Sequence, residues 1–333
     1  MRSGAIPRPR IAIIDDYQRV ALGFADWGRL NADVQVFHEP MSSEDQAAEL
    51  LKPFPIISLM RERTPFPASL IERLPRLRLL SMTGHRTTTL DVDACTRRGV
   101  LVTSTTNSRS VATAELAIGL ILSLSRSIHL GARNMSAGRW LDGLPVGQSV
   151  EGQVLGIVGL GKLGSRVAAV GRSLGMDVLA WSPNLTADRA QAVGAALARS
   201  KAELFERADV VSVHLVLSDC TRGIISRPEL AAMRPGSILV NTARALLIDQ
   251  EALLEALQAG RIRAGLDVYH PEPLPPDHPL RRLPNVLLTP HLGYVVQDMY
   301  ECFYREAFAN IAAYLDGTPT NVVNPEARDR MAG

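Results

Sequence analysis

Short apolar runs alternate with helix-like segments along the first hundred residues of the chain. The runs are typical of buried strands, because each is apolar at successive positions and is bounded by polar residues or glycine. They occupy 11–15, 34–38, 56–60, 77–84 and 100–104. The segments between them, "SSEDQAAELLK", "ASLIERL" and "DVDACTRRG", favour helices, the last with Asp91 as its N-cap and Gly99 as its end. This alternation predicts a parallel sheet with helices on its faces.

A second alternating series begins at residue 154. Its predicted strands are 154–159, 177–182, 208–215, 237–243, 264–269 and 285–291. The pattern before this series predicts one long helix at 110–133, and an apolar residue at every fourth position predicts a packed helix at 295–317. The hydrophobic pattern therefore predicts two parallel-sheet α/β domains joined by long helices.

Composition narrows the function classes. A chain of 333 residues favours two domains, and 46% hydrophobic with 21% charged residues is typical of a soluble globular protein. A net charge of +2 with scattered arginines argues against nucleic-acid and membrane partners. Three distant cysteines without a CxxC pair predict neither a disulfide framework nor a metal site. We find no signal peptide or membrane-spanning segment in the pattern, so a cytoplasmic location is expected.

The segment "GIVGLGKLGSRVA" carries the clearest chemical motif. Gly159, Gly161 and Gly164 have the G-x-G-x-x-G spacing, between a predicted strand and a predicted helix. In a dinucleotide site the first glycine makes the turn, the second lets the backbone approach a pyrophosphate, and the third lets the helix pack on the strand. The helix N-terminus then faces the phosphates with its partial positive charge. The sequence therefore predicts a nucleotide cofactor here.

Ser182 occupies the tip of the next predicted strand, 23 residues beyond Gly159. An acid at this point of an NAD site accepts hydrogen bonds from the adenosine ribose and repels the extra phosphate of NADP. Serine does not repel it, and Asn184 and Thr186 offer further donors, but Arg189 lies one or two helical turns away. The sequence thus removes a preference for NAD more clearly than it establishes one for NADP, and we expect NADPH to be accepted.

Three ionisable residues follow three of the predicted strands. Arg244 comes after "SILVNTA", Glu272 after "AGLDVYHP" and His291 within "NVLLTPH". Each alone has an ordinary explanation, as a surface arginine, a solvated loop acid or a structural histidine. Ligands gather at the carboxyl ends of parallel strands, however, and the three residues together suffice for carbonyl reduction. The arginine would bind a carboxylate, the imidazole would exchange a proton, and the acid would favour the protonated imidazole.

With these residues identified, the chain resembles the D-isomer-specific 2-hydroxyacid dehydrogenases over nearly its whole length. The segments that carry the resemblance are "LGIVGLGKLGSRVA", "MRPGSILVNTARALLIDQEAL", "AGLDVYHPEPLPPDHPL" and "NVLLTPHLG". The resemblance implies Arg244 as the substrate-binding arginine and Glu272–His291 as the acid–base pair. It also implies a Rossmann cofactor domain at 107–296, inserted into a flavodoxin-like substrate domain made of 1–106 and 297–333, and homodimers that form through the cofactor domain.

The resemblance also extends the expected binding residues. For NAD(P) they are Gly159, Leu160, Gly161, Lys162, Leu163, Gly164, Ser182, Asn184, His214, Thr242, Asp267 and Gly293, with Asp267 at the nicotinamide end. For the substrate they are Gly84, His85, Arg244 and Tyr294. The chain departs from the family at "MTGHRTTTLD", where a Gly-x-Gly loop is frequent and the role of Arg86 is open, and at Val216, which replaces a proline. Tyr294 stands where a small residue is frequent and would narrow the pocket.

The reaction expected is hydride transfer between NAD(P)H and a small 2-keto or D-2-hydroxy acid. Formate dehydrogenases share the architecture but resemble a variant with glutamine in place of Glu272, and phosphite oxidation is a less favoured alternative. The main alternative of another class is a non-catalytic, nucleotide-sensing protein similar to the corepressors among the relatives. The complete Arg–Glu–His set argues against it, and cofactor binding without turnover would support it.

Overall fold

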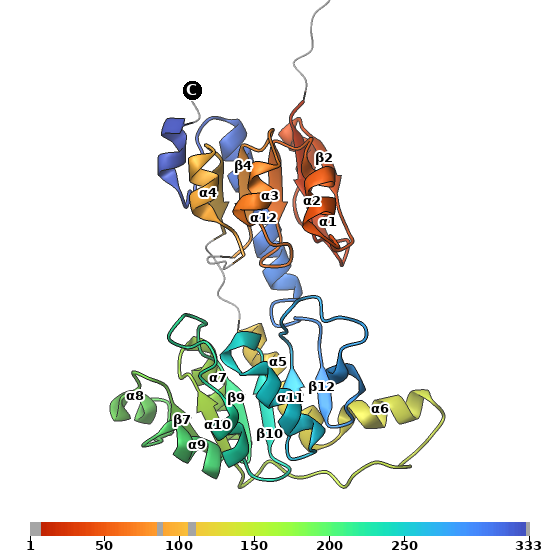
Figure 1. The fold of residues 1–333 in the computed structure, drawn as a ribbon, viewed down its shortest axis with the longest axis vertical. Coiled ribbons are helices and arrows are strands. Elements are labelled where there is room, and N and C mark those ends of the chain that lie inside the picture. Colours follow the sequence, from red (N-terminus) through yellow and green to blue (C-terminus); the bar gives the residue numbers. More distant parts are fainter. Residues whose placement is uncertain (1–7, 85–88, 106–110, 331–333) are drawn as a thin grey trace, which may run out of the picture. The chain divides into compact units, whose positions relative to one another are not determined.

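The computed structural model describes residues 8–84, 89–105 and 111–330, and in it the chain forms two compact units (Figure 1). The first unit is made of Met1–Arg109 together with Val296–Gly333, and the second is Ser110–Val295. The C-terminal segment therefore belongs to the same unit as the N-terminal segment, although the whole second unit separates them in the sequence. Each unit has its own sheet and its own hydrophobic core.

The first unit is built on five parallel strands in the order β2-β1-β3-β4-β5, the flavodoxin-like order. The strands are β1 (Arg10–Ile13), β2 (Asp33–Val36), β3 (Ile56–Leu59), β4 (Leu79–Met82) and β5 (Leu101–Ser104). β3, β4 and β5 are buried on both faces, whereas the edge strand β2 is only half-buried. The helices are α1 (Ala21–Phe24), α2 (Glu44–Leu51), α3 (Ala68–Glu72), α4 (Val92–Arg97) and α12 (Gln297–Leu315), with the 3-10 segments η1 (Trp27–Leu30) and η4 (Pro325–Arg330).

Two buried asparagines fasten the C-terminal segment to this sheet. Asn310 of α12 donates to the carbonyl of Ser104 at 3.0 Å. Asn324 accepts from the backbone N–H of Val102 at 2.8 Å and donates to the carbonyl of Val100 at 3.0 Å. Because both amides are fully buried, each lost partner would leave a desolvated polar group, which costs about 1–3 kcal/mol. These hydrogen bonds fix the position of the C-terminal segment along β5.

The second unit has seven parallel strands in the order β12-β11-β10-β9-β6-β7-β8, which is the Rossmann order with one added strand. The strands are β6 (Val154–Val158), β7 (Asp177–Trp181), β8 (Ala196–Leu197), β9 (Val210–Val213), β10 (Ile238–Asn241), β11 (Arg263–Leu266) and β12 (Val286–Leu288). The helices are α5 (Ala112–Ser125), α6 (Ile128–Ser136), α7 (Lys162–Ser173), α8 (Ala187–Gln191), α9 (Lys201–Arg207), α10 (Arg227–Ala232) and α11 (Gln250–Gln258), with η2 (Ala245–Leu247) and η3 (Pro279–Arg282). The predicted fold class of two parallel-sheet α/β domains is confirmed.

Two hydrophobic clusters cover the two faces of this sheet. One contains Leu204 of α9, Leu230 of α10 and Leu253 of α11, and the other contains Leu120 and Leu124 of α5 with apolar residues of α7. α5 approaches β11 closely at Gly265, where an added Cβ would lie 3.1 Å from the Cβ of Leu120. α5 is thus a helix that packs directly on the sheet through its buried face.

The single long helix predicted at 110–133 is wrong in one respect. Ser127 adopts a left-handed φ of 52°, which a right-handed helix cannot continue through, and α5 and α6 meet at an angle of 71°. The strand β8 was also not predicted, because two exposed residues carry no readable periodicity. The other predicted strands match observed ones, and Asp91 does cap α4, accepting from the N–H of Ala94 at 2.7 Å.

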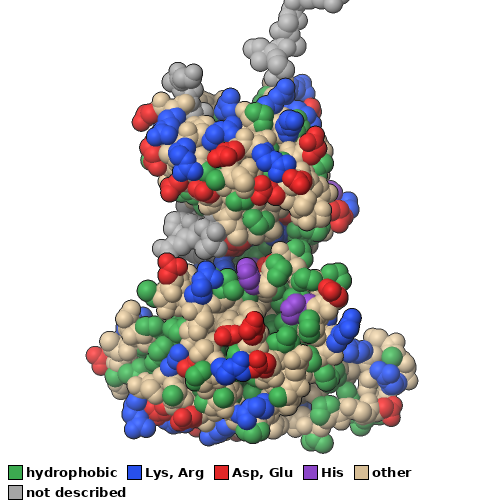
Figure 2. All heavy atoms as spheres, in the orientation of Figure 1, with side chains coloured by type: hydrophobic (Ala, Val, Ile, Leu, Met, Phe, Trp, Pro, Cys, Tyr) green, Lys and Arg blue, Asp and Glu red, His purple; other side chains and the backbone are tan. Residues whose placement is uncertain are grey.

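The charged side chains of both signs are interspersed over the face that Figure 2 presents, as the scattered arginines of the sequence suggest. Within the described residues, no single helix is long and apolar enough to cross a membrane. α5 and α6 reach that length and hydropathy only when taken together, across their 71° bend.

Candidate functional site

The order of the second sheet reverses between β6 and β9, and ligands of such sheets bind outside the carboxyl ends of the strands at this point. Gly159 follows β6 here with φ 102°, a conformation that L side chains rarely adopt. An added Cβ would also lie 2.8 Å from the backbone carbon of His214, which follows β9. Glycine is therefore required both by the turn and by the approach of the neighbouring chain.

The other two glycines of the motif have different roles. At Gly164 an added Cβ would lie 2.1 Å from the carbonyl oxygen of Gly159, so only glycine lets α7 pack this closely on β6. At Gly161, the N-cap of α7, an added Cβ would meet nothing within 4 Å. Its backbone therefore faces open space at the start of a 12-residue helix, whose first N–H groups have no partners within the helix.

These features fit the phosphates of a dinucleotide. Open space, a positive helix end and backbone donors come together at Gly161, as anion binding requires. Leu160 is buried and Leu163 packs against the core, so any cofactor contact of these residues would come from their backbone, while Lys162 lies exposed beside them. The buried hydroxyl of Thr242, at the end of β10, has no hydrogen-bond partner among the described residues, as expected of a group awaiting a ligand.

His214 lies on the other side of the switch point. Its Nε2 is 2.8 Å from the hydroxyl of Ser212, and burial lowers the pKa of its imidazole to about 4. The ring is therefore neutral at physiological pH, and its hydrogen bond to Ser212 fixes its orientation. A contact between His214 and a cofactor stays a prediction.

The loop after β7 contains Ser182 and Asn184. Ser182 is half-buried at the strand end, and its carbonyl accepts from the N–H of Leu185 at 3.1 Å. Asn184 is exposed, and its carbonyl accepts from Nη1 of Arg189 at 3.4 Å. The side chain of Arg189 therefore folds back onto this loop, which the spacing along the sequence did not reveal.

Arg244 leaves the end of β10 through a turn organised by Asn241. The Asn241 side chain is buried, accepts from the N–H of Ala243 at 3.0 Å and donates to the carbonyl of Arg244 at 2.9 Å. This side chain bridges the backbone of the turn, as asparagine does in Asx turns. Arg244 is half-buried, and its Nη1 donates to the carbonyl of Ala243 at 2.7 Å.

Glu272 and His291 come together as the sequence predicted. Nδ1 of His291 lies 2.7 Å from Oε2 of Glu272, and Oε1 of the same carboxylate accepts from the N–H of Tyr269 at 2.8 Å. Burial acts to raise the pKa of Glu272, but the hydrogen bond and charge of His291 outweigh it, with smaller help from Tyr269 and Arg244. The pKa of Glu272 is therefore below its usual value, and the acid is a carboxylate at neutral pH.

A buried carboxylate holds the turn on which His291 sits. Asp267 is fully buried at the end of β11 and accepts from the hydroxyl of Thr289 at 2.6 Å and from the N–H groups of Leu292 at 2.7 Å and Gly293 at 2.9 Å. His291 lies inside this clamp with a left-handed φ of 55°. Such a backbone persists only where its surroundings determine it, and Asp267 supplies that constraint.

Burial raises the pKa of Asp267, and the three hydrogen bonds oppose that rise. The carboxylate thus has a structural function in the turn, in addition to the contact with the nicotinamide end of a cofactor that the resemblance implies. That contact remains a prediction, as does a cofactor contact of Gly293.

Two tyrosines support the same turn. The hydroxyl of Tyr269 lies 2.7 Å from the carbonyl of Leu266 and 2.8 Å from that of Thr289, and so links the ends of β11 and β12. The buried ring of Tyr294 packs edge-on against the imidazole of His291, with centroids 5.4 Å apart. Sequence reasoning missed Tyr269, Thr289 and Asn241, although each lies within two residues of a predicted site residue. The role of Tyr294 in narrowing a substrate pocket stays a prediction.

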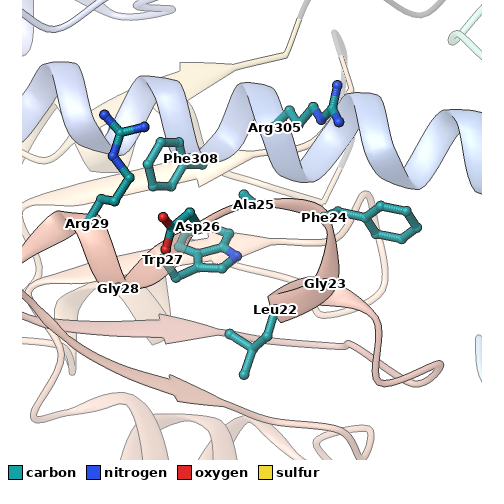
Figure 3. Close-up of a pocket in the computed structure, with 10 residues that line it drawn as sticks. All are labelled: Leu22, Gly23, Phe24, Ala25, Asp26, Trp27, Gly28, Arg29, Arg305 and Phe308. Atoms are coloured by element: carbon teal, nitrogen blue, oxygen red, sulfur yellow. The ribbon is translucent and has the colours of Figure 1, made fainter.

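The predicted substrate loop belongs to the first unit, and His85 and Arg86 lie outside the described residues. Gly84 has φ 90°, and its N–H donates to the hydroxyl of Thr105 at 2.8 Å. A substrate contact of Gly84 therefore stays a prediction. A separate surface hollow of this unit, lined by α1, η1 and two residues of α12, contains none of the predicted site residues (Figure 3).

Comparison with known proteins agrees with this geometry. A family model described as "D-isomer specific 2-hydroxyacid dehydrogenase, NAD binding domain" matches residues 118–293. A glyoxylate reductase of Aeropyrum pernix is 33% identical over 305 residues, which cover 88% of this chain and 90% of that protein. A D-3-phosphoglycerate dehydrogenase of Methanocaldococcus jannaschii is 33% identical over 284 residues, 85% of this chain. This chain spans 54% of that dehydrogenase, about half its length.

Solved structures show the same similarity over both units. A phosphoglycerate oxidoreductase of Vibrio cholerae has 43% sequence identity and a TM-score of 0.89, covering 93% of this chain and 99% of its own. A protein of Thermus thermophilus, TT0316, has 32% identity and a TM-score of 0.79, covering 94% of this chain and 99% of its own.

Proposed function

Because the chain belongs to the D-isomer-specific 2-hydroxyacid dehydrogenase family, we propose that it interconverts a small 2-keto acid and the corresponding D-2-hydroxy acid with NAD(P)(H). The family supports an NAD-dependent oxidoreductase of such acids. The observation that carries the proposal for this chain is the 2.7 Å contact between Nδ1 of His291 and Oε2 of Glu272. This pair provides a proton donor at the same strand-end side of the sheet as a glycine motif that fits a dinucleotide. Since Ser182 does not repel a ribose phosphate, we include NADPH among the accepted cofactors.

Each polar residue of the site has a definite task in keto-acid reduction. Arg244 binds the substrate carboxylate and orients the ketone, because a guanidinium forms paired charged hydrogen bonds with a carboxylate. Since Nδ1 of His291 is held by Glu272, Nε2 is the nitrogen that gives its proton to the carbonyl oxygen. The bound NAD(P)H supplies the hydride to the carbonyl carbon. In the reverse direction Nε2 takes the proton from the hydroxyl, and Glu272 stabilises the imidazolium in both directions.

A non-catalytic nucleotide sensor is the alternative function. It requires the dinucleotide site but has no need of an acid–base pair on a strained turn clamped by Asp267. Among the described residues this pair and its support are complete, which favours catalysis. The relatives act, by their names, on phosphoglycerate and on glyoxylate, so we propose a small substrate of this class.

The direct test is a reductase assay of glyoxylate, hydroxypyruvate, pyruvate and a bulkier branched keto acid, each with NADH and with NADPH. We expect turnover of at least one of the three small acids, and a product that chiral chromatography identifies as the D-enantiomer where the product is chiral. Dinucleotide binding without turnover of any acid would instead support the sensor.

His291→Ala is expected to lower kcat for reduction by about 10²–10⁴, because the proton donor is lost, while the Kd for NAD(P)H measured by calorimetry stays unchanged. The control is His38→Ala, since His38 lies in the first unit and contacts the carbonyl of Asp16 at 3.0 Å. A parallel loss of cofactor binding and kcat in the His291 variant would mean that the histidine is structural.

Arg244→Ala is expected to reduce kcat/KM for the keto acid at least tenfold, since a hydrogen bond to a charged group contributes about 1.5–3 kcal/mol. Arg244→Lys should recover part of this loss, because it keeps the charge but not the paired donors. Arg234→Ala, which removes an exposed arginine paired with Asp209, is the control. Unchanged steady-state kinetics in Arg244→Ala would remove this residue from the mechanism.

Glu272→Gln is expected to move the basic limb of the pH–rate profile for reduction to lower pH. Reduction needs the imidazolium of His291, which is depleted as pH rises. The carboxylate stabilises that cation, so the neutral amide lets the proton leave at lower pH. The profile of Glu251→Gln, which changes an acid of α11 away from this pair, should match the wild type. A basic limb at the same pH in Glu272→Gln and in the wild type would contradict the pairing of Glu272 with His291.

We also propose that the chain forms homodimers through its second unit. α6 and the loop after it project from this unit and present Met135, Trp140, Leu141 and Val146, each more than half exposed (Figure 1). Several exposed apolar side chains on one projecting segment are typical of an interface. We expect the wild type to sediment as a dimer and Trp140→Ser/Leu141→Glu as a monomer. The control Leu22→Ser, at an exposed leucine of the first unit, should stay dimeric, and a monomeric wild type would refute the proposal.

A further inference from the structure

We propose that Arg189 makes the cofactor site select the 2′-phosphorylated dinucleotide, NADP(H), over NAD(H). The inference rests on the dinucleotide site of the proposed function and names the residue that decides which cofactor this site takes. The Arg189 side chain lies at the tip of β7, and its charge suits the 2′-phosphate of NADP better than the 2′-hydroxyl of NAD.

Local structure brings the guanidinium of Arg189 to the strand tip. β7 ends at Trp181, and the chain turns through Ser182 to Thr186, whose hydroxyl caps α8 by accepting from the N–H of Arg189 at 3.4 Å. The Arg189 side chain then returns over this turn, and its Nη1 donates to the carbonyl of Asn184 at 3.4 Å. The guanidinium is thus bonded to the carbonyl of Asn184, two residues after Ser182. Position 182 faces the adenosine ribose in this fold.

No carboxylate of the described residues forms an ion pair with Arg189. The turn 182–186 contains no acid, while Asp177 begins β7 and Asp188 precedes Arg189 in α8. The arginine after the adjacent strand β8 differs: Arg199 is paired with Glu203 at 3.1 Å. The carboxylate of Glu203 also binds Arg207 at 2.8 Å. Arg189 is therefore an exposed cation at the tip of β7 that keeps donors for an incoming anion.

The two cofactors demand opposite groups at this point. The ribose hydroxyl of NAD donates to an acid at the strand end, and an acid repels the phosphate of NADP. A phosphate monoester carries a charge of about −1.5 to −2 at pH 7 and three acceptor oxygens, so it is bound by hydroxyl, amide and guanidinium donors. Ser182, Asn184 and Arg189 supply these three kinds of donor, and the turn offers the ribose of NAD no carboxylate.

Binding without substrate tests this inference independently of turnover. Calorimetric titration of the wild type with NADPH and NADH should give a Kd at least tenfold lower for NADPH. Arg189→Ala should weaken NADPH binding about tenfold or more and change the Kd for NADH less than twofold. Ser182→Asp should reverse the preference, whereas Ser182→Asn should not. Because Arg189 is exposed, its removal leaves the fold intact, which circular dichroism verifies.

Controls separate the phosphate effect from other causes. Arg207→Ala removes the same charge at the C-terminal end of α9, which leads into the start of β9 and so lies near the amino ends of the strands. This variant should leave the Kd values for NADPH and NADH unchanged. The fragment 2′,5′-ADP should bind more tightly than 5′-AMP to the wild type and lose that advantage in Arg189→Ala, because neither fragment reaches the nicotinamide end.

Two results would overturn the inference: a wild type that binds NADH at least as tightly as NADPH, or an Arg189→Ala variant with an unchanged Kd for NADPH. Keto-acid turnover with NADH alone would refute this inference and leave the proposed function standing. Selective binding of NADPH without turnover of any keto acid would refute the proposed function and leave this inference standing.

Discussion

The buried carboxylate of Asp267 holds the turn that carries His291, and the chemistry of the site depends on this contact. Three donors within 2.9 Å compensate the cost of placing a carboxylate in the core, and they fix His291 in a left-handed conformation that a histidine would otherwise leave. In this conformation Nδ1 of His291 lies 2.7 Å from Oε2 of Glu272. The pair proposed for acid–base chemistry is therefore partly exposed, whereas the carboxylate that holds its turn is fully buried.

The parallel sheet explains why so few residues make this site. All strands of the second unit end at the same edge, so turns that are distant in the sequence meet there. Each turn is organised by a short polar contact of its own: Asn241 for Arg244, Tyr269 for Glu272 and Asp267 for His291. Asn241 and Asp267 act through hydrogen bonds to backbone atoms, whereas the backbone N–H of Tyr269 donates directly to the Glu272 carboxylate.

The glycine motif and the loop after β7 separate binding from chemistry. Gly159 and Gly164 serve the packing of β6, α7 and the chain after β9, while Gly161 keeps a helix N-terminus open to phosphate. In the proposed function, the tip of β7 decides the charge met by the adenosine ribose, and the ionisable residues of the reaction lie after β10, β11 and β12. Under this proposal, cofactor selectivity changes at Ser182 or Arg189 without altering the pair of Glu272 and His291.

The sequence by itself determined the fold class, the glycine motif and the three ionisable residues, because strand periodicity, glycine spacing and strand-end position are local properties of the chain. It could not show the break at Ser127, where one residue leaves the helical conformation, or the two-residue strand β8. Only the tertiary structure decided that Arg189 folds back onto Asn184, that Tyr269 links two strand ends and that Asp267 clamps the turn of His291. These contacts depend on side-chain direction and on which strands are neighbours in the sheet, and neither property is written in the spacing of residues along the chain.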